Sequence, residues 1–141
     1  MRKVLLGLSL FVFVCSAFAA EETLYKRLGG YDAIAAVTDS FLGKLGSDPA
    51  LKGFFAGHSQ DSLTRTRQHI VDQLCMATGG PCKYTGRDMK TVHTGLGITE
   101  EHWNTSVKHL VATLDEFKVP QKEKDELLAI ASSLKKDIVE K

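Results

Sequence analysis

The spacing of apolar residues constrains this chain most strongly, because nearly every apolar run has the repeat of an α-helix. No stretch shows the two-residue alternation of a half-buried β-strand over a useful length. Glycine and proline separate the runs, as at Gly79-Gly80-Pro81. The sequence therefore predicts an all-α fold. The expected helices are a short piece within 23–30, a helix over 31–45, a brief turn over 48–55, a helix over 60–78, one that begins after Thr99 and one that begins at Pro120.

The beginning of the chain has the features of a secretory signal peptide. Arg2 and Lys3 precede an apolar run that ends in small residues near Ala19. We therefore predict a cleaved signal peptide over 1–20 and one mature domain over 21–141, located in the periplasm or secreted. An uncleaved membrane anchor is the alternative interpretation of the apolar run.

The charge balance argues against nucleic acid as a partner. The 141 residues carry a formal net charge of +1, with lysine and arginine interspersed among acidic residues. A protein that follows a phosphate backbone presents a basic stripe, which this sequence lacks. With 43% hydrophobic residues the chain has enough apolar surface for one core. We expect one compact domain that binds neither nucleic acid nor, in its mature form, a membrane.

Two cysteines lie close together in the predicted mature chain, at Cys75 and Cys82. In an oxidising compartment such a pair forms a disulfide more often than a metal site or a catalytic dithiol. A bridge requires the chain to turn back at Gly79 and Gly80. The other interpretation is a small buried residue at Cys75 and a free loop thiol at Cys82.

Among five histidines, His93 has the most apolar surroundings. Met89 and Leu96 lie one helical turn away and Val92 is adjacent, so the imidazole would belong to an apolar wall. From spacing alone, such a histidine is more often a core residue bonded to a carbonyl than a ligand. The sequence lacks a CxxCH segment, a glycine-rich phosphate loop, a nucleophile elbow and a HExxH motif. The poorly periodic joints between helices leave room for a large apolar cofactor. The default prediction for the three histidines outside the apolar stripes is a surface or half-exposed position: His58, His102 and His109.

Four stretches together resemble the group I truncated haemoglobins. They are "LYKRLGGYDAI", "DPALKGFFAG", "GGPCKYTGRDMKTVHTGLGIT" and "FKVPQ", and the resemblance covers nearly the whole predicted mature chain. It implies a truncated globin fold, a two-over-two helical sandwich around haem b. An irregular segment replaces most of the helix that carries the iron ligand.

The resemblance also implies roles for individual residues. His93 corresponds to the proximal iron ligand and Phe55 packs on the haem face. With the haem bound at His93, Met89, which spacing places in the apolar wall beside it, joins the expected haem-binding residues. His69 is either a distal iron ligand, as in some relatives, or a propionate or surface contact. Arg65 or Arg67 could pair with a propionate. Counted back from Gly79 and Gly80, the ligand-facing positions of the distal helix fall on Thr66, His69 and Ile70, followed by Gln73 and Leu74. Phe41 and Leu42 on the second helix complete the expected distal set.

Two positions depart from the pattern of many relatives. Leu42 stands where they have a tyrosine whose hydroxyl stabilises the bound gas, and Leu134 stands where some have a histidine that bonds covalently to a haem vinyl group. We therefore expect non-covalent haem and weaker retention of oxygen.

Three functions follow as hypotheses. The first is reversible binding of oxygen or another diatomic gas (O2, NO, CO), with conversion of nitric oxide to nitrate and an unidentified reductase as further expectations from the resemblance. The second is an electron-transfer or redox-sensing protein whose haem is held by His69 and His93. The third is a helical interaction module without haem, stapled by Cys75 and Cys82.

Overall fold

A computed structural model describes residues 21–141, all of them in helices, turns and loops. The predicted signal peptide over 1–20 lies outside the described residues. The predicted all-α fold is confirmed for the described part of the chain. The elements are α1 (Leu24–Arg27), α2 (Gly30–Ser47), the 3-10 helix η1 (Lys52–Phe55), α3 (Gln60–Ala77), α4 (Met89–His93), α5 (Glu100–Glu116), α6 (Gln121–Ser133) and α7 (Lys135–Ile138).

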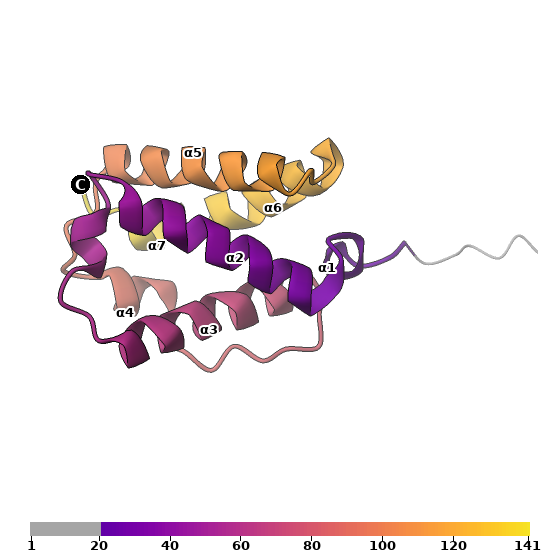
Figure 1. The fold of residues 1–141 in the computed structure, drawn as a ribbon, viewed down its shortest axis with the longest axis horizontal. Helices are drawn as coiled ribbons and strands as arrows, with labels where there is room; N and C mark the ends of the chain where they lie inside the picture. The colour runs from indigo at the N-terminus through magenta and orange to yellow at the C-terminus, as the bar shows by residue number, and fades with distance from the viewer. Residues whose placement is uncertain (1–20) are drawn as a thin grey trace, which may run out of the picture.

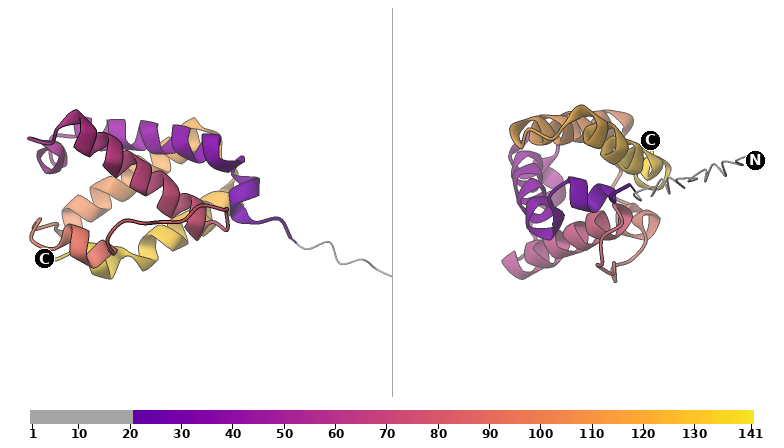
Figure 2. Two further views of the ribbon diagram at one scale, coloured as in Figure 1. Left: turned by 90° about the horizontal axis from the view of Figure 1, so that it is seen from below. Right: turned by 90° about the vertical axis from the view of Figure 1, so that its right-hand side faces the viewer.

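Two antiparallel helical pairs make up the fold. Helix α3 runs back along α2, and α6 runs in the direction opposite to α5 (Figure 1). Helix α2 packs against both α3 and α5, so it joins the two pairs, while the short α4 packs against α7. Seen from the end of the molecule near α1, α3 lies on the side opposite α5 and α6 (Figure 2). This arrangement is the two-over-two sandwich that the resemblance to truncated haemoglobins implies.

Side-chain caps define where several helices begin. Thr23, Ser59 and Asp88 each accept a hydrogen bond from a backbone N–H in the first turn of α1, α3 and α4 respectively. Thr99 caps α5 as predicted, and His102 completes a capping box by accepting from the Thr99 N–H. The first turn of α5 also carries Glu100 and Glu101, which favour the positive end of the helix dipole.

Two predicted elements differ from the structure. The apolar repeat of the helix predicted to begin at Pro120 extends through Leu134 to Ile138, but α6 ends at Ser133 and α7 begins at Lys135. The apolar repeat runs through this break, so spacing alone does not reveal it. The segment expected to be irregular ends in the five-residue helix α4, which Asp88 caps.

The fully buried core is small. Its members come from both helical pairs and include Thr38, Val71, Cys75, Thr113 and Leu114, each 0% exposed. The buried hydroxyls of Thr38 and Thr113 both have hydrogen-bond partners, because each donates to a backbone carbonyl one turn earlier in its helix. An apolar cavity of about 100 Å³ lies between the pairs, so they do not pack fully against each other. Its lining includes Val37, Leu74, Leu114, Phe117 and Leu127.

None of the helices within 21–141 is long and apolar enough to cross a membrane.

Candidate functional site

Helix α4 places His93 at its C-terminal end. Asp88 anchors the start of the helix by accepting from the Thr91 N–H at 2.9 Å and from the Thr91 hydroxyl at 2.6 Å. These bonds, the hydroxyl first, hold the pKa of Asp88 below its ordinary range, so the cap is ionised at neutral pH. Helix α4 packs against α7, which braces it from the C-terminal end of the chain.

The imidazole of His93 is half-buried and oriented by its own helix. Its Nδ1 lies 2.7 Å from the carbonyl oxygen of Met89. Since a carbonyl oxygen only accepts, Nδ1 carries the proton and donates it. In the neutral imidazole, Nε2 then keeps its lone pair. A backbone carbonyl that fixes the tautomer in this way is the usual support of a metal-binding histidine. His93 therefore fits the role of a haem iron ligand.

The loop after His93 is joined to the C-terminus. The Glu140 N–H donates to the carbonyl of Ile98 at 2.8 Å, and the Glu100 N–H donates to the carbonyl of Lys141 at 3.1 Å. The segment that follows α4 is therefore tied down, which restricts how far His93 can move.

His69 lies in the middle of α3 and carries an unsatisfied polar atom. Its Nδ1 is buried and has no hydrogen-bond partner, the one such side-chain atom found within 21–141. Leaving a buried polar atom unpaired costs roughly 1–3 kcal/mol, so such an atom calls for an explanation. An imidazole without a protein partner fits the second histidine, or the propionate contact, that the resemblance to haem proteins implies.

The other predicted site residues occupy four elements. Ile70 and Leu74 on α3 are half-buried, as are Phe41 and Leu42 on α2. Met89 begins α4 and Phe55 ends η1, both half-buried. Thr66 is exposed on α3, so the protein itself does not cover it.

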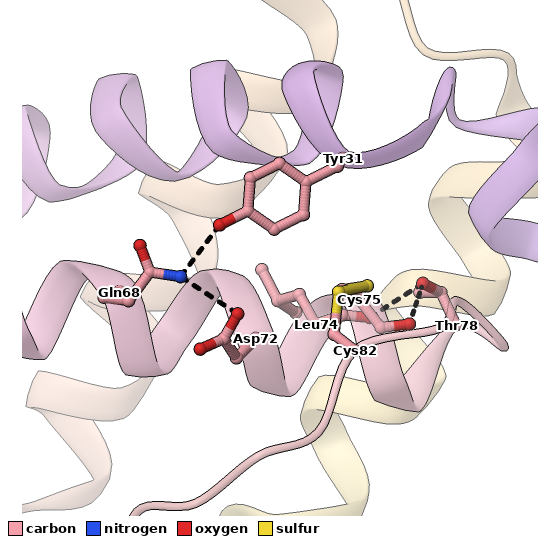
Figure 3. The surroundings of a disulfide bond; sticks show 7 residues. All are labelled: Tyr31, Gln68, Asp72, Leu74, Cys75, Thr78 and Cys82. Atoms are coloured by element: carbon pink, nitrogen blue, oxygen red, sulfur yellow. Dashed lines mark hydrogen bonds between the residues drawn. A yellow bond between two sulfur atoms is a disulfide. The ribbon is translucent and has the colours of Figure 1, made fainter.

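A disulfide joins the end of α3 to the following loop. Cys75 and Cys82 are bonded, with their Cα atoms 5.7 Å apart (Figure 3). Of the two interpretations of these cysteines, the disulfide is the one confirmed. Cys75 is fully buried next to Ile34 and Val71, so the bridge ties the loop to the core.

Sequence reasoning missed the contacts of several polar side chains. His109 pairs with Asp48 at 2.8 Å and so links α5 to the turn after α2. Arg67 donates twice to Asp39, which lowers the pKa of that carboxyl, so Arg67 is already partnered within the protein. Tyr84 packs its ring edge-on against His69, with ring centroids 5.8 Å apart. These partners are 28 residues apart for Arg67 and 61 for His109, and local sequence patterns carry no signal for them.

A family model and several curated relatives match most of this chain. The model of the bacterial-like globin family matches residues 23–140. The chain is 34% identical to the group 1 truncated haemoglobin GlbN of Mycolicibacterium paratuberculosis over 120 residues, which is 85% of this chain and 86% of that protein. It is 34% identical to the group 1 truncated haemoglobin GlbN of Synechocystis over 116 residues, which is 79% of this chain and 91% of that protein.

Solved structures of haemoglobins are also similar to this chain over most of its length. The Fe(III) form of truncated haemoglobin from Tetrahymena pyriformis is 30% identical, with a TM-score of 0.77 over 85% of this chain and all of that one. A 2/2 haemoglobin from Synechococcus, in a cyanomet state with covalently attached haem, is 30% identical, with a TM-score of 0.76 over 84% and 98% of the two chains. The chain thus belongs to the bacterial-like globin family, among its group 1 truncated haemoglobins.

Proposed function

We propose that this protein binds haem b through His93 and reversibly takes up oxygen or another diatomic gas. The observation that carries the proposal is the hydrogen bond from His93 Nδ1 to the Met89 carbonyl, because it leaves Nε2 as a free ligand atom. Family membership adds support, since the haemoglobins that the chain resembles carry iron. The haem supplies reversible coordination of the gas, and the protein sets access, polarity and proximal geometry.

The distal residues should hold the gas weakly. Phe41, Leu42, Ile70 and Leu74 are apolar and half-buried, so none can donate a hydrogen bond to a polar ligand. Within the predicted distal set, His69, Gln73 and the exposed Thr66 carry groups that can donate. With a leucine at position 42, oxygen dissociation should be faster than in relatives with a tyrosine there. Conversion of nitric oxide to nitrate remains part of the proposal, together with a separate reductase.

The haem should be bound without a covalent link. Leu134 occupies the position where some relatives carry a histidine, and a leucine side chain has no nucleophilic atom for a vinyl group. This is a difference from the Synechococcus protein, whose haem is covalently attached.

A second function is favoured by His69. Its buried Nδ1 has no protein partner, and its ring lies on the helix that the resemblance places on the distal side. An imidazole at the sixth coordination position would leave no open site in the resting protein. The result would be an electron-transfer or redox-sensing protein, or one in which gas competes with His69.

Export to the periplasm or beyond is part of the proposal. The signal-like start of the chain predicts it, and a disulfide agrees with an oxidising compartment.

The two functions are separated by absorption spectra and by carbon monoxide binding to the ferrous protein. Sharp, split low-spin bands without added ligand would indicate a second protein ligand, and a broad high-spin band would indicate an open site. If His69 competes for the iron, His69→Ala should speed carbon monoxide association. The matched control is His58→Ala, because His58 is an exposed histidine just before α3. An unchanged rate in His69→Ala would favour the open site, and a protein that takes up no haem would refute both functions.

A further inference from the structure

The aromatic contact between Tyr84 and His69 connects the loop after α3 with the distal helix. The two rings meet edge to face, with an interplanar angle of 74° and centroids 5.8 Å apart. Both side chains are half-buried. Because Nδ1 of His69 has no hydrogen-bond partner, packing alone orients this imidazole. Tyr84 is the aromatic residue whose ring contacts the imidazole of His69.

Tyr84 is itself fixed by its own loop. Its hydroxyl donates to the carbonyl oxygen of Arg87 at 2.5 Å, and its ring lies over Gly86. A Cβ at Gly86 would overlap the Tyr84 ring, including its Cε2 atom at 2.8 Å, so a side chain there would displace the ring. The close packing of the Tyr84 ring on Gly86 and the hydrogen bond from its hydroxyl to Arg87 therefore fix the position of the tyrosine.

The disulfide anchors the other end of this loop to α3. Cys75 lies on the same helix as His69, and Cys82 precedes Tyr84 by two residues. The turn between the cysteines is tight, because a Cβ at Gly80 would approach the Cys75 sulfur to 2.7 Å and its carbonyl to 2.8 Å. Figure 3 shows the chain leaving Cys82 beneath α3. The disulfide thus fixes the starting point of the segment that carries Tyr84.

We propose that Tyr84, held in place by the Cys75–Cys82 disulfide, is a positioning residue for His69. Its ring limits the orientations of the imidazole and so raises the fraction of time that His69 occupies the distal side of the haem. The inference rests on the proposed function, since it concerns how His69 competes with an external gas.

The test compares four ferrous, haem-loaded proteins: wild type, Tyr84→Ala, His69→Ala and the double variant. Tyr84→Ala should speed carbon monoxide association by about threefold and reduce the low-spin absorption, a size that the loss of one edge-to-face aromatic contact permits. In the His69→Ala background the same change should leave the rate unaltered. A merely structural role would change the rate equally in both backgrounds, which would overturn the proposal.

Tyr84→Phe is the conservative control. It keeps the ring and loses only the hydroxyl bond to Arg87, so its rate and spectrum should stay close to wild type. If it behaves like Tyr84→Ala, the ring contact is not what positions His69. A rise of the low-spin bands in Tyr84→Ala would also contradict the proposal, because Tyr84 would then hold His69 away.

A second readout does not depend on gas binding. In the low-spin ferrous protein without added gas, which is diamagnetic, proton cross-relaxation should connect the rings of Tyr84 and His69. The signal should weaken in Cys82→Ala, and its persistence at full strength would show that the disulfide is not needed. If His69→Ala leaves gas binding unchanged, the positioning proposal fails while the gas-binding function stands. If His93→Ala keeps its haem, the proposed function fails instead.

Discussion

The carboxylate of Glu140 accepts a hydrogen bond of 2.6 Å from the backbone N–H of Gly95, forty-five residues earlier in the chain. Its second oxygen accepts from the N–H of Gly97 at 2.5 Å. Gly95 and Gly97 both have positive φ, at 86° and 67°, a backbone shape that favours glycine. One C-terminal side chain thus clamps the loop that follows the proposed proximal histidine.

Replacing Glu140 should loosen that loop. In Glu140→Gln one side-chain oxygen remains as an acceptor, so one of the two backbone N–H groups loses its partner. We expect severalfold faster transfer of haem to a competing apoglobin. Glu101→Gln, an exposed glutamate on α5, is the matched control and should transfer haem at the wild-type rate.

The same clamp predicts a pH dependence. The two backbone N–H bonds hold the pKa of Glu140 below its ordinary value of 4.5. The stabilisation is therefore complete above about pH 4.5 and is lost as the pH falls through the lowered folded pKa. Thermal midpoints of wild type and Glu140→Gln should differ by a constant amount at neutral pH and converge in acid. A gap that widens in acid would contradict this assignment.

The pair between Asp48 and His109 should stabilise the junction of α2 and α5. The hydrogen bond from His109, followed by that from the Ala50 N–H, lowers the pKa of Asp48 below its ordinary 3.8. Asp48→Asn should lower the thermal midpoint by a few degrees at neutral pH. The difference should vanish as the pH falls below that lowered pKa, where wild type also loses the charge. An identical midpoint at pH 7 would show that this partly exposed pair contributes nothing.

Removing the disulfide should cost about 2.5 kcal/mol of unfolding free energy, from the entropy of closing so short a loop. Cys82→Ala is the preferred variant, because Cys82 is half-buried whereas Cys75 is fully buried. Urea unfolding of this variant should match that of wild type reduced with dithiothreitol. A variant as stable as the oxidised protein would mean that the bridge constrains little.

The haem should be extractable into acidified butanone in full, because Leu134 offers no atom for a vinyl bond. The absorption maximum of the pyridine haemochrome should be that of unmodified haem b. Haem that stays with the protein after extraction would overturn the expectation of non-covalent binding.

Long-range contacts mark the limit of what the sequence predicts here. Helix α3 and the start of α5 are predictable, because periodic apolar residues and the cap at Thr99 act locally. The break at Leu134 is invisible in the apolar repeat. The clamp of Glu140 on Gly95 depends on tertiary structure alone.

The two histidines of the proposed site were identified from different features of the sequence. His93 was singled out by its apolar neighbours and assigned through family resemblance, and the structure adds the bond to Met89 that sets its tautomer. His69 was identified by its place before Gly79. Its contact with Tyr84 depends on a tight loop whose path was not predictable from spacing.

The central claim is that His93 holds the haem, and the most direct measurement is a haem titration of His93→Ala beside wild type and His69→Ala. We predict that His93→Ala loses most of its haem affinity, that added imidazole restores a ligated spectrum and that His69→Ala still binds haem. A His93→Ala variant that retains haem with an unchanged spectrum would contradict the proposed function.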